Sequence, residues 1–141
     1  GRRSMELLIG GCFQGKLDYA KKKWEDRHIS ITEHNIVEGS YLAALGQGQI
    51  DREIKIIDRL HLLVRACEKE DRGEEIFSVL EAILLSIPDI VLICDEVGLG
   101  IVPVDRQECQ YREAVGRMLC FLAGRAERVE RIIAGMPVRI K

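Results

Sequence analysis

A glycine-rich segment near the N-terminus has the residue types and spacing of a phosphate-binding loop. Residues 10–17 follow the pattern G-x-x-x-x-G-K and read Gly10, Gly11, Cys12, Phe13, Gln14, Gly15, Lys16 and Leu17. In such a loop the glycines let backbone N–H groups curl around phosphate oxygens, and the start of the following helix adds positive potential. The lysine reaches the outer phosphates. We therefore expect residues 10–17 to bind the phosphates of a nucleotide, with Lys16 as a catalytic candidate.

The residue after the lysine departs from the usual pattern. Leu17 stands where Ser or Thr normally supplies a hydroxyl to the magnesium ion, and leucine cannot ligate a metal. The sequence thus favours nucleotide binding over efficient ATP hydrolysis or transfer. A simpler alternative is that the glycines only form a turn that caps the following helix.

Two acidic residues are candidates for placing magnesium beside the phosphates. Asp95 follows the unbroken apolar run of residues 90–94, and Glu33 follows an alternating segment, residues 28–32. Carboxyl ends of parallel strands are where α/β sheets bind ligands. Asp95 and Glu33 therefore compete for this role, and an ordinary polar strand end remains an alternative for Asp95. His34 could serve acid–base chemistry, although a lone loop histidine is commonly inert.

Short apolar runs alternate with longer amphipathic stretches along the chain. The predicted strands are 5–10, 28–32, 90–95 and 129–134, followed by an antiparallel edge segment at 138–141. The predicted helices span 16–26, 49–70, 74–87 and 105–125. This alternation predicts a three-layer α/β fold with a mostly parallel sheet.

Apolar periodicity supports the helices. The helix at 49–70 has a stripe at period 3.6, formed by Ile50, Ile54, Ile57, Leu60, Val64 and Cys67. His61 lies beside this stripe and is expected to be a packed histidine. The last helix begins with a capping-box pattern at Asp105 and Glu108, and its inward stripe is Tyr111, Val115, Met118 and Leu122. On the same helix, Arg106, Arg112 and Arg117 could face phosphates or simply form a solvated face.

Composition excludes several classes of protein. The chain has 141 residues, 47% hydrophobic and 31% charged, which suits one folded domain rather than a disordered tail. A formal charge of −2 lacks the basic footprint of a general nucleic-acid binder, and residues 21–23, the basic run, suit a solvated helix face. No apolar stretch approaches the ~18 residues of a membrane span. Residues 1–4, before Met5, are interpreted as a cloning remnant, which leaves a single nucleotide-binding domain at 5–141.

Cysteine usage favours a reduced, cytoplasmic protein. The five cysteines are scattered and form no C-x-x-C pair, so a structural zinc site is not expected. Cys67, Cys94 and Cys120 lie among apolar residues and are expected to pack in the core.

Several of these segments resemble the bifunctional adenosylcobinamide kinase/adenosylcobinamide-phosphate guanylyltransferase family of cobalamin biosynthesis. Gly10, Gly11, Gly15 and Lys16 match the family loop G-G-x-x-S-G-K-S. Residues 96–103 match the family's E-V-G-x-G-I-V-P, and residues 134–141 match its ending A-G-x-P-x-x-I-K. Between these segments, residues 111–113 and 116–117 match the aromatic-R-D and G-R patterns, with Glu113 in place of the Asp.

The resemblance implies a P-loop fold that uses ATP or GTP with magnesium, a corrinoid intermediate as second ligand, and assembly into cyclic trimers. Gln14 and Leu17 replace both serines of the family loop, and Asp95 replaces an Asn. The segment that carries the guanylyl-accepting histidine in the family has no counterpart, since His28 and His34 lack its surrounding pattern.

Three functions stay open from the sequence. The first is a cobinamide kinase-like protein in which Lys16 holds the phosphates while Asp95 or Glu33 places magnesium. The second is a degenerate paralogue that binds nucleotide or a corrinoid intermediate as a regulator or partner. The third is an assembly protein that has kept only the fold.

Overall fold

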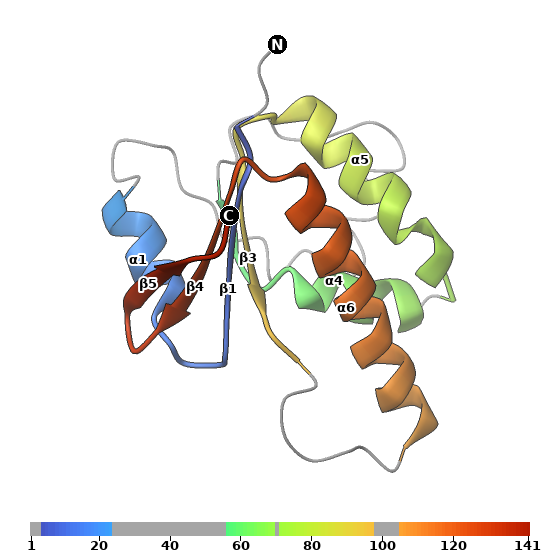
Figure 1. The fold of residues 1–141 in the computed structure, drawn as a ribbon. Helices are drawn as coiled ribbons and strands as arrows, with labels where there is room; N and C mark the ends of the chain where they lie inside the picture. The colour runs from blue at the N-terminus through green and yellow to red at the C-terminus, as the bar shows by residue number, and fades with distance from the viewer. Residues whose placement is uncertain (1–3, 24–55, 70, 98–104) are drawn as a thin grey trace.

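A five-stranded sheet with the strand order β2-β3-β1-β4-β5 forms the centre of the molecule (Figure 1). The computed structural model describes residues 4–23, 56–69, 71–97 and 105–141. The strands are β1 (Glu6–Gly10), β2 (Ile56–Ile57), β3 (Val91–Asp95), β4 (Arg128–Ile133) and β5 (Met136–Arg139). The first four strands pair in parallel, and β5 pairs antiparallel with β4 at the edge.

Helices cover both faces of this sheet. They are α1 (Lys16–Lys23), α4 (His61–Lys69), α5 (Ile76–Ser86) and α6 (Arg106–Arg125), with a 3-10 turn, η1 (Gly73–Glu75), before α5. Helix α1 lies on one side, and α4, α5 and α6 lie on the other (Figure 1). The core divides accordingly, because Ala20 of α1 clusters with Leu8 and Ile93 while the other helices pack on Leu7 and Leu92. The predicted three-layer α/β fold is confirmed.

The predicted strands at 5–10, 90–95 and 129–134 are confirmed to within about a residue. The antiparallel C-terminal edge is confirmed as well, although β5 begins and ends two residues before the predicted segment 138–141. Residues 91–94 of β3 are fully buried, which explains their unbroken apolar run: the strand is covered on both faces. The strand predicted at 28–32 lies outside the described residues.

The helix predicted over 49–70 is wrong in its described part. Ile56 and Ile57 form β2 and pair with Val91 and Leu92 of β3, and α4 begins only at His61. Both isoleucines are fully buried on opposite faces of the sheet, which a helical stripe would not allow. The β-branched side chains favour this strand. Arg59, with a positive φ of 55°, separates the strand from the helix.

The later helices follow their predicted stripes. The side chains of Ile76, Leu80, Ile83 and Ile87 are buried, although the first turn of the predicted 74–87 helix is 3-10. The α6 stripe of Tyr111, Val115, Met118 and Leu122 is also buried. Asp105 Oδ1 accepts a hydrogen bond from the backbone N–H of Gln107 at 2.8 Å, as a helix cap should.

Of the three cysteines that were predicted to pack in the core, two are buried and one is exposed. Cys67 and Cys94 are buried, but Cys120 is exposed, so the prediction for Cys120 is wrong. Cys120 lies two residues after Met118 on α6, about 200° around the helix from that buried residue, and therefore faces away from the core. Among the described helices, none is both long and apolar enough to cross a membrane.

Candidate functional site

Three neighbouring strands carry polar residues at their carboxyl ends, which together form what we call the sheet edge. The glycine-rich loop, residues 10–17, follows β1, Asp58 follows β2, and Asp95 ends β3. Because these strands are parallel and adjacent, their carboxyl ends meet there. A cavity of about 390 Å³ opens at this edge, lined by Cys12, Phe13, Gln14, Gly15, Lys16, Leu17, Asp18, Asp58, Arg59, His61, Leu62 and Asp95.

Glycine is required at both ends of the loop turn. A Cβ on Gly10, whose φ is +154°, would lie 2.6 Å from the carbonyl oxygen of Ile132 in β4. Gly15 has a φ of +82°, in the left-handed region that side chains rarely adopt. The loop is also held to the turn after β4, since the Gly135 N–H donates to the Gln14 carbonyl oxygen at 2.9 Å. These constraints fix the loop at the edge of the sheet.

Lys16 is folded into the site rather than out into solvent. Its Nζ donates to the Gly11 carbonyl oxygen at 2.7 Å and lies 2.8 Å from Asp95 Oδ1, and its side chain is only 7% exposed. The ammonium group is thus held between the loop backbone and the end of β3, where the outer phosphates of a bound nucleotide would lie.

His61, the first residue of α4, orients Asp95. Its Nδ1 accepts a hydrogen bond from the Asp95 backbone N–H at 3.2 Å, and its Nε2 lies 3.6 Å from Asp95 Oδ2. Burial lowers the pKa of His61, which favours the neutral ring, and a neutral ring is what an accepting Nδ1 needs. The expected burial of His61 is confirmed, but the ring also lines the cavity.

Asp58 brings a second carboxylate to the cavity. Burial raises the pKa of Asp58, while its Oδ1 accepts a hydrogen bond from the Arg59 backbone N–H at 2.9 Å. Asp58, Arg59 and the site role of His61 were not predicted, because all three lie within the helix expected at residues 49–70. A sequence signal was nonetheless present. Asp58 directly follows the apolar pair Ile56 and Ile57, just as Asp95 directly follows an apolar run. We call Lys16, Asp58, His61 and Asp95 the edge cluster.

The edge cluster fits magnesium only together with a bound phosphate. Among the described residues, no group of three or more His, Cys, Asp or Glu side chains could hold a metal ion alone. Magnesium at nucleotide sites is commonly held by one or two carboxylates plus phosphate oxygens. Asp58 and Asp95 line one cavity and could supply those carboxylates, whereas Leu17 supplies no oxygen.

Among the other residues singled out from the sequence, the arginines of α6 lie away from the cavity at the sheet edge. Glu33 and His34 are outside the described residues. Arg112 and Arg117 lie along α6, each 4.0 Å from a glutamate of the same helix. Neither they nor Arg106 line the cavity at the sheet edge. The basic side chains that do line it are Lys16 and Arg59.

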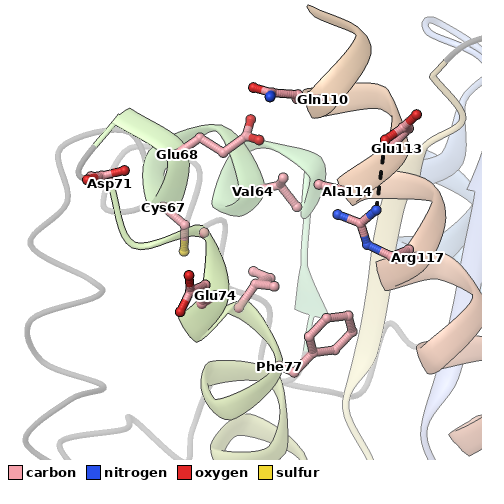
Figure 2. Close-up of a pocket in the computed structure, with 12 residues that line it drawn as sticks. Val64, Cys67, Glu68, Asp71, Glu74, Phe77, Gln110, Glu113, Ala114 and Arg117 are labelled. Carbon is pink, nitrogen blue, oxygen red and sulfur yellow. Dashed lines mark ion pairs between the residues drawn. The ribbon is translucent and has the colours of Figure 1, made fainter. Parts of the chain in front are cut away.

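A larger cavity of about 710 Å³ lies among α4, η1, α5 and α6 (Figure 2). Four carboxylates line it, those of Glu68, Asp71, Glu74 and Glu113. The cation there, Arg117, is paired with Glu113 (Figure 2). Such a lining repels phosphate, so the smaller cavity at the sheet edge is the better candidate for anion binding.

A second charged cluster holds α1 on the sheet. Glu130 of β4 is 2% exposed, and its carboxylate accepts hydrogen bonds from Tyr19 and Lys23 of α1 at 2.9 Å each. Arg128 adds a third donor at 3.3 Å. We call Tyr19, Lys23, Arg128 and Glu130 the anchor cluster. It attaches α1 to β4 of the sheet.

The anchor cluster lowers the pKa of Glu130 and raises the pKa of Tyr19. Burial by itself would raise the pKa of Glu130, but the hydrogen bonds from Lys23, Tyr19 and Arg128 outweigh it and the pKa is lowered. Burial and the hydrogen bond to Glu130 raise the pKa of Tyr19 to about 12. Both shifts favour the charge states that the hydrogen bonds require.

Comparison with known proteins gives one consistent result. The family described as "CobU: Cobinamide kinase / cobinamide phosphate guanyltransferase" matches residues 30–140. The bifunctional adenosylcobalamin biosynthesis protein CobU of Salmonella typhimurium is 30% identical over 89 residues, which cover 63% of this chain and 40% of that protein. Its namesake from Escherichia coli is 37% identical over 67 residues, covering 48% and 37% respectively.

The matches cover part of each relative and begin partway along this chain. The chain spans about two-fifths of the length of the curated relatives it matches. The family match begins at residue 30, after the glycine-rich loop. The interpretation of residues 10–17 as a phosphate site therefore depends on their motif and geometry.

Proposed function

Because the chain belongs to the CobU family of cobinamide kinases and cobinamide phosphate guanyltransferases, we propose that it binds ATP or GTP at residues 10–17 and phosphorylates a cobinamide-type corrinoid. The observation that carries this proposal is the placement of Lys16. Its buried ammonium group lies between the Gly11 carbonyl oxygen and the Asp95 carboxylate, at the mouth of a loop of the G-x-x-x-x-G-K type.

In the proposed binding step, Lys16 exchanges its contact with Asp95 for contacts with phosphate. Phosphate oxygens take the place of Asp95 Oδ1 on Lys16 Nζ, and backbone N–H groups at the start of α1 face the inner phosphates. Charge-assisted contacts of this kind contribute roughly 1.5–3 kcal/mol each. Asp95 and Asp58 would then be free to hold magnesium beside the phosphates. When bound, magnesium neutralises charge that develops on the phosphate oxygens.

His61 has a positioning role in this proposal. Its neutral ring, hydrogen-bonded to the Asp95 backbone, keeps that carboxylate directed towards the cavity. Asp58 enters from the neighbouring strand, and its raised pKa reflects a carboxyl that lacks full solvation. A cation beside Asp58 would compensate for that lost solvation.

The proposal covers phosphoryl transfer and leaves out guanylyl transfer. Family members use a histidine within a characteristic segment for the guanylyl step, and His28 and His34 lack that surrounding pattern. His61, the third histidine of the sequence, lies beside Asp95 and accepts a hydrogen bond from its backbone N–H.

A second candidate function is favoured by Leu17. Without a hydroxyl at this position, the site could bind a nucleotide or corrinoid and turn over poorly, so that the protein acts as a regulator or partner. The resemblance also leads us to expect a homo-oligomer, a trimer in the family. Light scattering that gives a clean monomer at working concentration would contradict that expectation.

A turnover assay separates these functions. Purified protein is incubated with cobinamide, magnesium and either ATP or GTP, and phosphorylated cobinamide is detected by mass spectrometry. Lys16→Ala serves as the site variant and Lys23→Ala as the matched control on the same helix. Product that requires Lys16 but not Lys23 supports the kinase. Saturable nucleotide binding without product supports the second candidate, and the absence of both contradicts the proposed function.

A further inference from the structure

Phe13, in the middle of the glycine-rich loop, has an unfavourable backbone conformation and an apolar side chain that is exposed to solvent. Its φ is +60°, in the left-handed region, and its side chain is 96% exposed. A bulky side chain in that region is a genuine outlier, and residues held in such conformations cluster at ligand clamps and active sites. Full exposure of the ring adds a second cost, because its apolar surface remains in water.

The cavity at the sheet edge has two kinds of wall. The edge cluster supplies the charged wall, while Phe13, Leu17 and Leu62 supply apolar surface in the same lining. Leu17 and Leu62 are partly covered by the core, and Phe13 stands clear of it. A phosphate chain can use the charged wall only. The apolar wall therefore suits a ligand, or a second ligand, with a large non-ionic surface.

The direction of the phosphate chain indicates which ligand meets Phe13. Helix N-termini and the loop amides hold the inner phosphates, and the lysine tip reaches the outer ones. Lys16 Nζ donates to the Gly11 carbonyl oxygen, and the cavity that Lys16 lines is lined by Phe13 as well. The outer phosphate is the one that a phosphoryl acceptor must approach in line.

We propose that Phe13, with Leu62 as a second contact, forms the apolar surface on which the phosphoryl acceptor rests. The class of acceptor that fits is a large molecule with a conjugated, apolar face, and the macrocycle of a corrinoid offers such a face. Aromatic side chains stack on such faces, and contact with the acceptor would remove the ring of Phe13 from water. This inference depends on the proposed function, which supplies the phosphate-binding half of the site.

The test measures acceptor binding and nucleotide binding separately. Cobinamide is titrated into the full chain and followed by its visible absorbance, in the presence of ATP whose β,γ-bridging oxygen is replaced by NH. The variants are Phe13→Ala, Phe13→Tyr, and Leu85→Ala as matched control, because Leu85 is 70% exposed on α5 and lines neither cavity described above. ATP affinity is measured on each protein by calorimetry.

We expect Phe13→Ala to weaken cobinamide binding about tenfold while the affinity for ATP changes by less than about threefold. Phe13→Tyr and Leu85→Ala should both bind cobinamide like the unmodified protein. Intact ATP binding with unchanged cobinamide affinity in Phe13→Ala would overturn the inference, as would equal weakening of both ligands. A change in oligomeric state without a change in cobinamide affinity would assign Phe13 to a subunit contact and overturn it too. Failure of the unmodified protein to bind ATP would instead contradict the proposed function itself.

Discussion

Two lysines of α1, one at its first residue and one at its last, each meet a carboxylate of the sheet, but in contrasting surroundings. Lys16 lies 2.8 Å from Asp95, whose side chain is 22% exposed in the cavity at the sheet edge. Lys23 lies 2.9 Å from Glu130, whose side chain is 2% exposed beneath the helix. The two lysines are two helical turns apart and therefore lie on the same face of α1.

The difference lies in how completely each carboxylate is satisfied. Glu130 accepts hydrogen bonds from three side chains, so every exchange of partners in the anchor cluster costs free energy. Asp95 shares Lys16 with a backbone carbonyl and borders the cavity, and in the proposed function a phosphate replaces it on the lysine. One helix thus carries a fixed attachment at one end and an exchangeable ion pair at the other.

The largest expected effect comes from deleting each lysine in turn. Lys16→Ala should weaken ATP binding by about tenfold to a hundredfold, because one or more charge-assisted phosphate contacts are lost. Lys23→Ala should leave the affinity for ATP within about threefold of the unmodified value, since Lys23 faces Glu130. Isothermal titration calorimetry measures both. Equal losses in the two variants would remove the distinction between the clusters.

Neutralising the two carboxylates should separate stability from binding. Glu130→Gln should lower the free energy of unfolding by about 2 kcal/mol, because buried charge-assisted hydrogen bonds are weakened. Asp95→Asn should cost less than about 1 kcal/mol, since the Asp95 side chain borders the cavity and Lys16 keeps its hydrogen bond to the Gly11 carbonyl oxygen. Urea unfolding of both variants provides the comparison. A larger loss for Asp95→Asn than for Glu130→Gln would show that the edge cluster, too, is structural.

Acid should weaken the anchor cluster in a defined direction. The pKa of Glu130 is lowered in the folded protein, so the unfolded chain binds its proton first as the pH falls. The stability supplied by Glu130 is therefore complete above about pH 4.5 and declines as the pH drops through the folded-state value. Urea unfolding measures the free energy of unfolding of the unmodified protein and of Glu130→Gln. The difference between the two should be constant above about pH 4.5 and should become smaller below it. A difference that grows in acid would contradict a lowered pKa of Glu130.

The smallest expected effect concerns magnesium. Leu17→Ser restores a hydroxyl beside the phosphates and should increase the enhancement of ATP binding by magnesium about threefold to tenfold. Calorimetric titrations with and without magnesium, on both proteins, measure this ratio. A strong enhancement already present in the unmodified protein would show that Asp58, Asp95 or water suffices, and the argument from Leu17 would fail.

Much of the fold could be predicted from local patterns that admit one interpretation. A short unbroken apolar run such as residues 91–94 is typical of a strand covered on both sides, and the G-x-x-x-x-G-K spacing indicates a turn between strand and helix. The stripe around Ile57 admitted two interpretations, because apolar residues at helical spacing also fit a short buried strand followed by a helix. Pairing of β2 with β3, a contact between distant segments, decided between them.

The candidate site was only half predictable for the same reason. Lys16 and Asp95, which line the cavity, could be proposed from the sequence because each follows a recognisable strand. Asp58 and His61 were missed because their role depends on which strand lies next to β3. The anchor cluster was missed as well, since Glu130 is separated by more than 100 residues from the helix that it holds, and no local pattern records that contact.

The measurement that tests the central claim most directly is a titration of the unmodified protein with ATP, followed through the chemical shifts of its backbone amides. We predict saturable shifts confined to residues 10–17, to residues 58–61 and to Asp95, which inorganic tripolyphosphate reverses by competition. The amides around Glu130 and those lining the cavity of Figure 2 should stay unshifted. Shifts centred on Glu68 and Arg117, or no saturable shift at millimolar ATP, would contradict the assignment of the phosphate site to the edge cluster.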